Sequence, residues 1–252
     1  MSFQSFVKGV FYKLGYSLKR LRPAGKVRTA AAPAQTGTRD IRSMIHAVDP
    51  YEGFDASAYP LDLQGWGSET PAFREILTQK RPKLIVEVGT WKGGSAIHMA
   101  EILATEKIDA HMVCIDTWLG ALEFWTDHSD PDRYKSLRLK NGWPQVYYQF
   151  LANVVHKGHQ ARITPFPQTS ATGAMWLAAF GIKADVIYVD GSHEEEDVYA
   201  DVLGYWEALA PGGVLFGDDW GWAGVRLAVQ RFAGENGLTI RHVADKWVLE
   251  KK

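Results

Sequence analysis

The stretch KLIVEVGTWKGGSA, residues 83–96, combines a strand, a turn and the start of a helix. Its apolar run is broken only by Glu87, which is typical of a strand buried on both faces of a parallel sheet. Gly89, Gly93 and Gly94 follow, and glycines at such a turn let a ligand approach the backbone at a helix N-terminus. The stretch therefore predicts a strand–turn–helix unit with a ligand held at the turn.

The rest of the chain repeats this alternation of strands and helices. Further strands are predicted at residues 110–116, 162–167, 184–190, 213–219, 239–245 and 246–252. Helices are predicted from about Thr70 to residue 77, and at residues 93–106, 194–211 and 224–237, with Pro71 at the first helical position after a Thr70 cap. The pattern predicts an α/β fold, a mostly parallel sheet that ends in an antiparallel hairpin.

Composition narrows the function classes. The chain has 252 residues, 46% of them apolar and 23% charged, with a formal net charge of −1, so no general attraction to nucleic acid is expected. No stretch approaches the ~20 apolar residues that span a bilayer. The single cysteine, Cys114, excludes an internal disulfide and fits a reducing cytoplasm.

The N-terminal region differs from the rest. Residues 3–22 carry apolar side chains at spacings of three and four, five basic residues and no acidic one. This pattern suits a helix on an anionic membrane surface, which would make a cytoplasmic protein peripheral to the inner membrane face. The alternative is a helix that docks on its own domain or on a second subunit of a homo-oligomer. Residues 23–40 read as a linker, and the folded domain is predicted to span residues 41–252.

The glycine turn is not that of a dinucleotide-binding protein, because Gly89 and Gly93 are four apart and the Gly-x-Gly-x-x-Gly fingerprint is missing. Lys92, within the turn, is expected to be exposed. Asp116 ends the second strand, where an acid can accept hydrogen bonds from both hydroxyls of a ribose. The alternative for Asp116 is a helix cap or a turn residue.

Taken together, the motifs resemble the class I S-adenosylmethionine-dependent methyltransferases. The matching segments are EVGTWKG, CIDTW, YVDGSH and LAPGGVLFGDDW. The resemblance implies a Rossmann-like seven-stranded sheet with its last strand antiparallel, and S-adenosyl-L-methionine as cofactor. The cofactor-binding residues that it implies are Glu87, Gly89, Thr90, Gly93, Ser95, Asp116, Thr117, Thr169, Ser170 and Asp190.

A narrower resemblance concerns VDGSH and GDDW, which look like motifs of the metal-dependent macrolide-sugar O-methyltransferases and their cephalosporin-pathway relatives. It implies that Asp190, Asp218 and Asp219 bind Mg²⁺, and that His193 is the general base, with Asp190 also in the catalytic set. The chemistry agrees, since three converging carboxylates repel one another without a cation and oxygen ligands suit Mg²⁺. The alternative for Asp190 and His193 is a capping turn at a helix N-terminus, and the alternative for Asp218 and Asp219 is a loop.

Residues 117–153 are too long for an ordinary connection and are expected to form a substrate lid, or alternatively a dimer interface. The resulting prediction is an S-adenosylmethionine-dependent O-methyltransferase that acts on a hydroxyl of a sugar or of a glycan or glycolipid precursor. Two alternatives remain open. One is a methyltransferase for another small molecule, a phenol or an amide, and the other is an NAD-linked oxidoreductase of similar fold.

Overall fold

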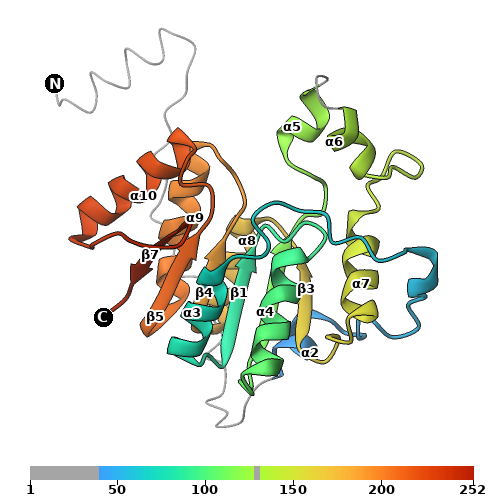
Figure 1. The fold of residues 1–252 in the computed structure, drawn as a ribbon, viewed down its shortest axis with the longest axis horizontal. Coiled ribbons are helices and arrows are strands. Elements are labelled where there is room, and N and C mark those ends of the chain that lie inside the picture. Colours follow the sequence, from blue (N-terminus) through green and yellow to red (C-terminus); the bar gives the residue numbers. More distant parts are fainter. Residues whose placement is uncertain (1–39, 128–130) are drawn as a thin grey trace, which may run out of the picture. The chain divides into compact units, whose positions relative to one another are not determined.

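The computed structural model describes residues 40–127 and 131–252, and the predicted helix and linker before residue 40 lie outside them. Within this part of the chain, the strands form a 7-stranded sheet in the order β3-β2-β1-β4-β5-β7-β6 (Figure 1). The strands are β1 (Leu84–Val88), β2 (His111–Asp116), β3 (Ile163–Pro167), β4 (Ala184–Val189), β5 (Leu209–Gly217), β6 (Arg241–Val243) and β7 (Lys246–Glu250).

Strand direction agrees with the prediction. The strands β1 to β5 pair in parallel, while β7 runs antiparallel to both β5 and β6. The order of the strands along the sheet changes direction between β1 and β4. The carboxyl ends of these two strands, and of their neighbours β2 and β5, lie at one edge of the sheet. Ligands of open α/β sheets bind at this edge. The predicted Rossmann-like sheet with an antiparallel last strand is confirmed.

Helices cover both faces of the sheet. On one face lie α3 (Pro71–Lys80), α4 (Gly94–Thr105) and α7 (Val146–His156), and Figure 1 shows α3 and α4 in front of the strands. On the other face lie α8 (Ser170–Phe180), α9 (Glu195–Ala208) and α10 (Ala223–Asn236). The shorter elements are α2 (Ile41–Ile45), the 3-10 turn η1 (Ala56–Ala58), α5 (Leu122–Thr126) and α6 (Pro131–Ser136). Each face buries a separate apolar cluster against the sheet.

Two helix boundaries test the sequence signals. The start of α3 is as predicted, because the side chain of Thr70 accepts a hydrogen bond from Ala72 N and Pro71 takes the first helical position. The end of α9 was predicted too late. Gly212 N donates to Lys251 O and Lys251 N donates to Gly213 O, so this segment extends β5 backward and the helix stops at Ala208.

The long insert contributes to the core as well as to the surface. Val146 and Phe150 of α7 are buried against the sheet, so this part of the insert is not a lid. In contrast, α5 and α6 project beyond the sheet (Figure 1). The lid prediction therefore narrows to the segment that carries these two short helices.

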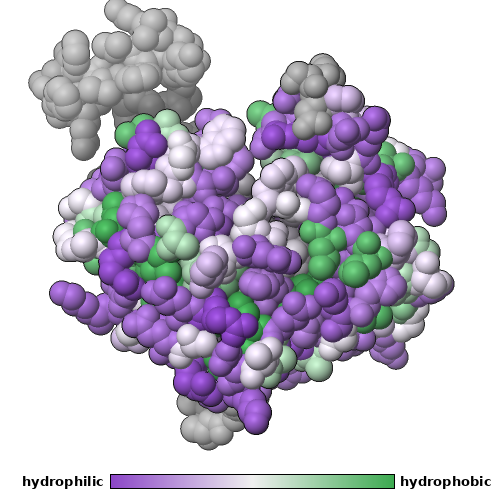
Figure 2. Space-filling model, viewed as in Figure 1, coloured by the Kyte–Doolittle hydropathy of each residue, from purple (hydrophilic) through white to green (hydrophobic). Residues whose placement is uncertain are grey.

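The visible surface is mainly hydrophilic, with hydrophobic residues in small separate groups (Figure 2). Within residues 40–127 and 131–252, no helix combines the length and the apolar character that crossing a membrane requires.

Candidate functional site

The glycine turn, residues 89–94, lies where β1 meets α4. Gly89 has φ +80°, and a Cβ there would lie 1.9 Å from the carbonyl oxygen of Asp190 at the end of β4. Gly93 has φ +86° and precedes α4 without a side-chain hydrogen bond to the first helical turn. Both positions require glycine, and the amides that begin α4 have no capping side chain.

Glu87 and Ser95 lie beneath the turn. Glu87 is fully buried in β1 and accepts a hydrogen bond from the Ser95 hydroxyl, while Cys114 Sγ lies 3.6 Å from its other oxygen. Burial raises the pKa of Glu87 to about 8. Thr90 is also buried, at 2% exposure. Glu87 and Ser95 thus support the turn from inside, and a direct contact with the cofactor stays a prediction.

Asp116 holds the turn from the neighbouring strand. Its Oδ2 accepts from Thr90 N and Trp91 N, both at 2.8 Å, and its Oδ1 accepts from Trp118 N at 2.7 Å. Burial raises the pKa of Asp116, while these backbone donors lower it. The structure therefore brings Asp116 to the glycine turn as predicted, although its carboxylate is already engaged with backbone amides. Thr117 is exposed beside it.

Thr169 and Ser170 begin α8 after β3. The side chain of Thr169 caps the helix by accepting from Thr172 N at 3.2 Å. Ser170 donates its hydroxyl to Asp201 of α9, and burial raises the pKa of Asp201 to about 6. Ser170 is therefore turned toward α9, which leaves the exposed Thr169 as the residue of this pair that faces solvent.

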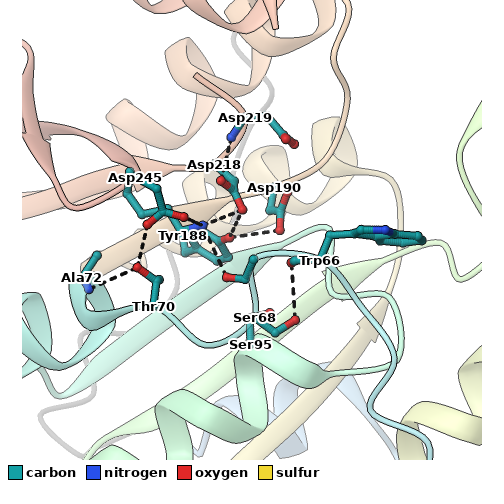
Figure 3. Close-up of polar contacts among 12 residues, drawn as sticks. Trp66, Ser68, Thr70, Ala72, Ser95, Tyr188, Asp190, Asp218, Asp219 and Asp245 are labelled. Carbon is teal, nitrogen blue, oxygen red and sulfur yellow. Dashed lines mark hydrogen bonds and ion pairs between the residues drawn. The ribbon is translucent and has the colours of Figure 1, made fainter. Parts of the chain in front are cut away.

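The aspartate cluster, Asp190, Asp218 and Asp219, follows β4 and β5. Tyr188 OH lies 3.0 Å from Asp190 Oδ2 and 3.5 Å from Asp218 Oδ2, so the phenol stands between the two carboxylates (Figure 3). Burial, and then the charges of Asp218 and Asp219, raise the pKa of Asp190 to about 7. The predicted convergence of carboxylates at adjacent strand ends is present.

The predicted magnesium site does not fit this arrangement. Asp218 Oδ2 lies 2.5 Å from Nζ of the buried Lys246, and its Oδ1 accepts from Asp219 N at 2.8 Å. Asp219 turns its carboxylate toward His193 instead. Among the described residues, no group of three His, Cys, Asp or Glu side chains is placed to hold a metal ion. Both oxygens of Asp218, and one oxygen each of Asp190 and Asp219, are thus engaged with protein groups.

His193 follows β4 at the same edge of the sheet. Its Nε2 is 2.9 Å from Asp219 Oδ2, its Nδ1 is 3.7 Å from Glu123 Oε1, and its ring stacks on Trp222 at 4.4 Å. The hydrogen bond that His193 donates to Asp219 raises the pKa of His193. Burial opposes this rise, and the nearby charges of Asp219, Glu123 and Asp190 add to it. The alternative of a simple capping turn does not explain these contacts, because α9 begins at Glu195 without a side-chain cap.

Lys92 is a correction. The sequence predicted an exposed lysine, but only 3% of Lys92 is exposed and its Nζ pairs with Asp62 Oδ2 at 2.8 Å. The segment before α3 crosses the glycine turn and supplies this partner, and Gln64 Oε1 accepts from Trp91 Nε1 at 3.3 Å. This tertiary partner is what buries the lysine.

Sequence reasoning also missed residues that complete the site. Glu123 comes from the insert, Trp222 from the start of α10, and Lys246 from β7. None of the three follows from a local sequence pattern, and the position of Lys246 depends on how β7 pairs. An antiparallel β7 beside β5 pairs Gly217 with Trp247, which places residue 246 next to Asp218.

Comparison with known proteins identifies the family of this chain. Residues 86–220 match the family described as Methyltransferase domain. The chain belongs to this methyltransferase family. One relative is the 8-demethyl-8-(2,3-dimethoxy-alpha-L-rhamnosyl)-tetracenomycin-C 4'-O-methyltransferase of Streptomyces olivaceus, 30% identical over 174 residues. The match covers 65% of this chain and 63% of that relative, so it spans less than two thirds of the relative's length.

Solved structures show the same methyltransferase fold. The O-methyltransferase TomG from Streptomyces achromogenes, solved with SAM, has a TM-score of 0.52 at 16% identity, over 84% of this chain and 99% of TomG. The calicheamicin methyltransferase CalS11 has a TM-score of 0.51 at 14% identity, over 99% of this chain and 93% of CalS11. At identities this low, the similarity shows the fold alone.

Proposed function

We propose that the protein is an S-adenosylmethionine-dependent O-methyltransferase that acts on a hydroxyl of a sugar or of a glycan or glycolipid precursor. The observation that carries the proposal is the environment of His193. This imidazole is held by Asp219, is stacked on Trp222 and follows β4, the strand that pairs with β1. A histidine held in this way can accept a proton from a hydroxyl group.

The cofactor half of the site is assigned to the glycine turn. The uncapped start of α4 offers backbone amides and a helix dipole to the carboxylate of the cofactor's amino-acid part. Asp116 is assigned to the ribose and Thr169 to the base, in keeping with the exposure of Thr169. Gly89 and Gly93 let this turn pack closely against Asp190 and Phe150. When bound, S-adenosylmethionine supplies the electrophilic methyl group.

The acceptor half is assigned to His193. Its Nε2 is engaged with Asp219, which leaves Nδ1 to receive the hydroxyl proton when the oxygen attacks the methyl group. Asp219 and Glu123 then flank the resulting imidazolium with negative charge. No step is assigned to a divalent cation, because the carboxylates of the aspartate cluster do not fit one.

A sugar acceptor is favoured by exposed aromatic rings near the site. Trp222 is 53% exposed beside His193, and Trp66 is 56% exposed and contacts Phe124 and Trp91 edge-on or tilted. Flat indole faces suit the apolar faces of sugar rings. The Streptomyces olivaceus relative is a methyltransferase of a rhamnosyl-tetracenomycin, and CalS11 is a TDP-rhamnose 3'-O-methyltransferase. A phenol could stack on the same indole rings. The acceptor tests therefore include a phenol.

The test measures cofactor choice and chemistry separately. Calorimetry should show binding of S-adenosylmethionine and none of NAD, which separates the proposal from an oxidoreductase. A panel of nucleotide-activated and rhamnose-bearing acceptors, with a catechol as the phenol, is then assayed for methyl transfer. Binding of NAD in place of S-adenosylmethionine would refute the proposal.

His193→Ala should lower kcat by roughly 10²–10⁴-fold with little change in cofactor affinity. The control is His156→Ala, an exposed histidine of α7 whose Nε2 contacts Tyr59 O at 2.8 Å. Equal losses of kcat and cofactor affinity in His193→Ala would show a structural histidine instead of a base.

A further inference from the structure

Lys246 is an unusual lysine because none of its surface is exposed. An ammonium group removed from water is retained only where anions compensate its lost hydration. Here Nζ lies 2.5 Å from Asp218 Oδ2 and 3.2 Å from Asp245 Oδ2. The rings of Phe73 and Tyr188 each have their centres 5.9 Å from Nζ. Lys246 is therefore a buried cation built into the strand edge.

The partner carboxylate is fully engaged. Asp218 Oδ1 accepts from Asp219 N, and Oδ2 faces both Lys246 and the Tyr188 hydroxyl, which also contacts Asp190. Figure 3 shows Tyr188 between Asp190 and Asp218, with Asp245 and Thr70 on the other side of this group. The contacts thus form a continuous row that runs from Lys246 through Asp218 and Tyr188 to Asp190.

The backbone at Gly67 closes over this pair. Gly67 has φ +58°, and its carbonyl oxygen is 3.4 Å from Lys246 Nζ. A Cβ at Gly67 would lie 2.4 Å from Asp218 Oδ2 and 3.0 Å from Nζ. Mg²⁺ demands octahedral geometry and keeps several waters. The space around Asp218 Oδ2 is taken by the lysine, the tyrosine and this backbone.

We propose that Lys246 is the permanent counter-cation of the aspartate cluster, and that methyl transfer by this protein needs no divalent metal ion. The inference rests on the proposed function only in taking methyl transfer as the reaction. The pairing of Lys246 with Asp218 does not depend on it. Lys246 is a positioning residue. It fixes Asp218, whose Oδ1 holds Asp219 N, and Asp219 then adopts φ +61° and orients His193.

The first experiment uses the wild-type protein after metal removal. Electron paramagnetic resonance of added Mn²⁺ should show no stoichiometric binding, and turnover in EDTA should stay within about twofold of turnover in Mg²⁺. Stoichiometric Mn²⁺ binding that disappears in Asp218→Asn would overturn the proposal. So would a tenfold or greater loss in EDTA, roughly the scale of a genuine metal contribution.

The second experiment removes the lysine. Lys246→Ala opens the space at Asp218 and should gain Mn²⁺ binding, which the added Asp218→Asn change should abolish. A variant with a melting transition but no gained binding would contradict the proposal. The matched control is Lys80→Ala, since Lys80 pairs with Glu250 of the same strand β7 at 3.4 Å. It should gain no Mn²⁺ binding.

If Lys246→Ala does not fold, the charge-neutral pair Lys246→Met with Asp218→Asn replaces it. Its kcat should fall about tenfold or more while the KM for S-adenosylmethionine changes little, as expected for lost positioning of His193. An unchanged kcat would overturn the positioning role. The Mn²⁺ measurement needs no turnover, so it stays informative even where calorimetry shows no S-adenosylmethionine binding and the proposed function fails.

Discussion

Two groups of carboxylates lie along the same edge of the sheet and are neutralised differently. At the glycine turn, Asp116 is satisfied by the amides of Thr90 and Trp91, backbone donors that lie on the adjoining strand-to-helix turn. In the aspartate cluster, Asp218 is balanced by Lys246, a side chain on another strand. One half of the site is therefore built from backbone geometry, and the other from a charge pair between elements that are distant in the sequence.

The largest expected effect concerns the acid beneath the glycine turn. The pKa of Glu87 is raised from 4.5 to about 8, so folding favours its neutral form. The free energy of unfolding therefore falls as pH rises from 4.5 towards 8, because the unfolded chain ionises and the native state does not. The difference corresponds to at most about 5 kcal/mol.

Glu87→Gln should remove this pH dependence. Urea unfolding should find the variant more stable than wild type at pH values near the raised pKa, with no difference in mildly acidic buffer. Exposed Glu52→Gln serves as control and should leave the wild-type pH dependence unchanged. A parallel pH dependence in wild type and Glu87→Gln would contradict the burial of a neutral acid.

The next effect tests the backbone-held carboxylate. Asp116→Ala should weaken S-adenosylmethionine binding by about 2–4 kcal/mol, since it removes a charged acceptor and releases the two turn amides. Calorimetry measures the affinity. Asp109→Ala, an exposed acid just before β2, should bind the cofactor like wild type. An unchanged affinity in Asp116→Ala would remove Asp116 from the site.

A smaller effect tests the closure over the charge pair. Gly67→Ala should destabilise the protein by roughly 2–3 kcal/mol, because the new methyl group meets Asp218 Oδ2 at 2.4 Å and Lys246 Nζ at 3.0 Å. Gly53→Ala is a matched control, since φ is +69° there and nothing lies within 4 Å of the added Cβ. It reports the backbone strain alone, about 1–2 kcal/mol. Equal losses in the two variants would contradict close contact at Gly67.

The smallest effect is a shift in the pH profile. His193 acts as a base only when neutral, so its raised pKa moves the rising limb of kcat toward higher pH. Asp219→Asn lowers that pKa and should move the limb toward lower pH, while also reducing the plateau. Glu123→Gln should move it in the same direction by less, because Glu123 makes a smaller contribution. A shift in the opposite direction would exclude His193 as the titrating base.

Sequence reasoning predicted the fold and the glycine turn because their determinants are local. The apolar run before Gly89 and the Thr70-Pro71 helix start each fall within a few residues of the structure they form. The burial of Lys92 and the occupation of Asp218 by Lys246 were missed. Both depend on partners from other elements, Asp62 and β7, which no local pattern announces. A metal-binding motif identifies the carboxylates, but it does not reveal that a lysine from another strand pairs with one of them.

The place of β7 in the sheet links the orientation of His193 to the pairing of the last strands. This strand lies between β5 and β6, and it is the strand that carries Lys246. A chain that has assembled β1, β4 and β5 but not yet β7 holds Asp218 without its ammonium partner. The orientation of His193 therefore requires that β7 has paired with β5.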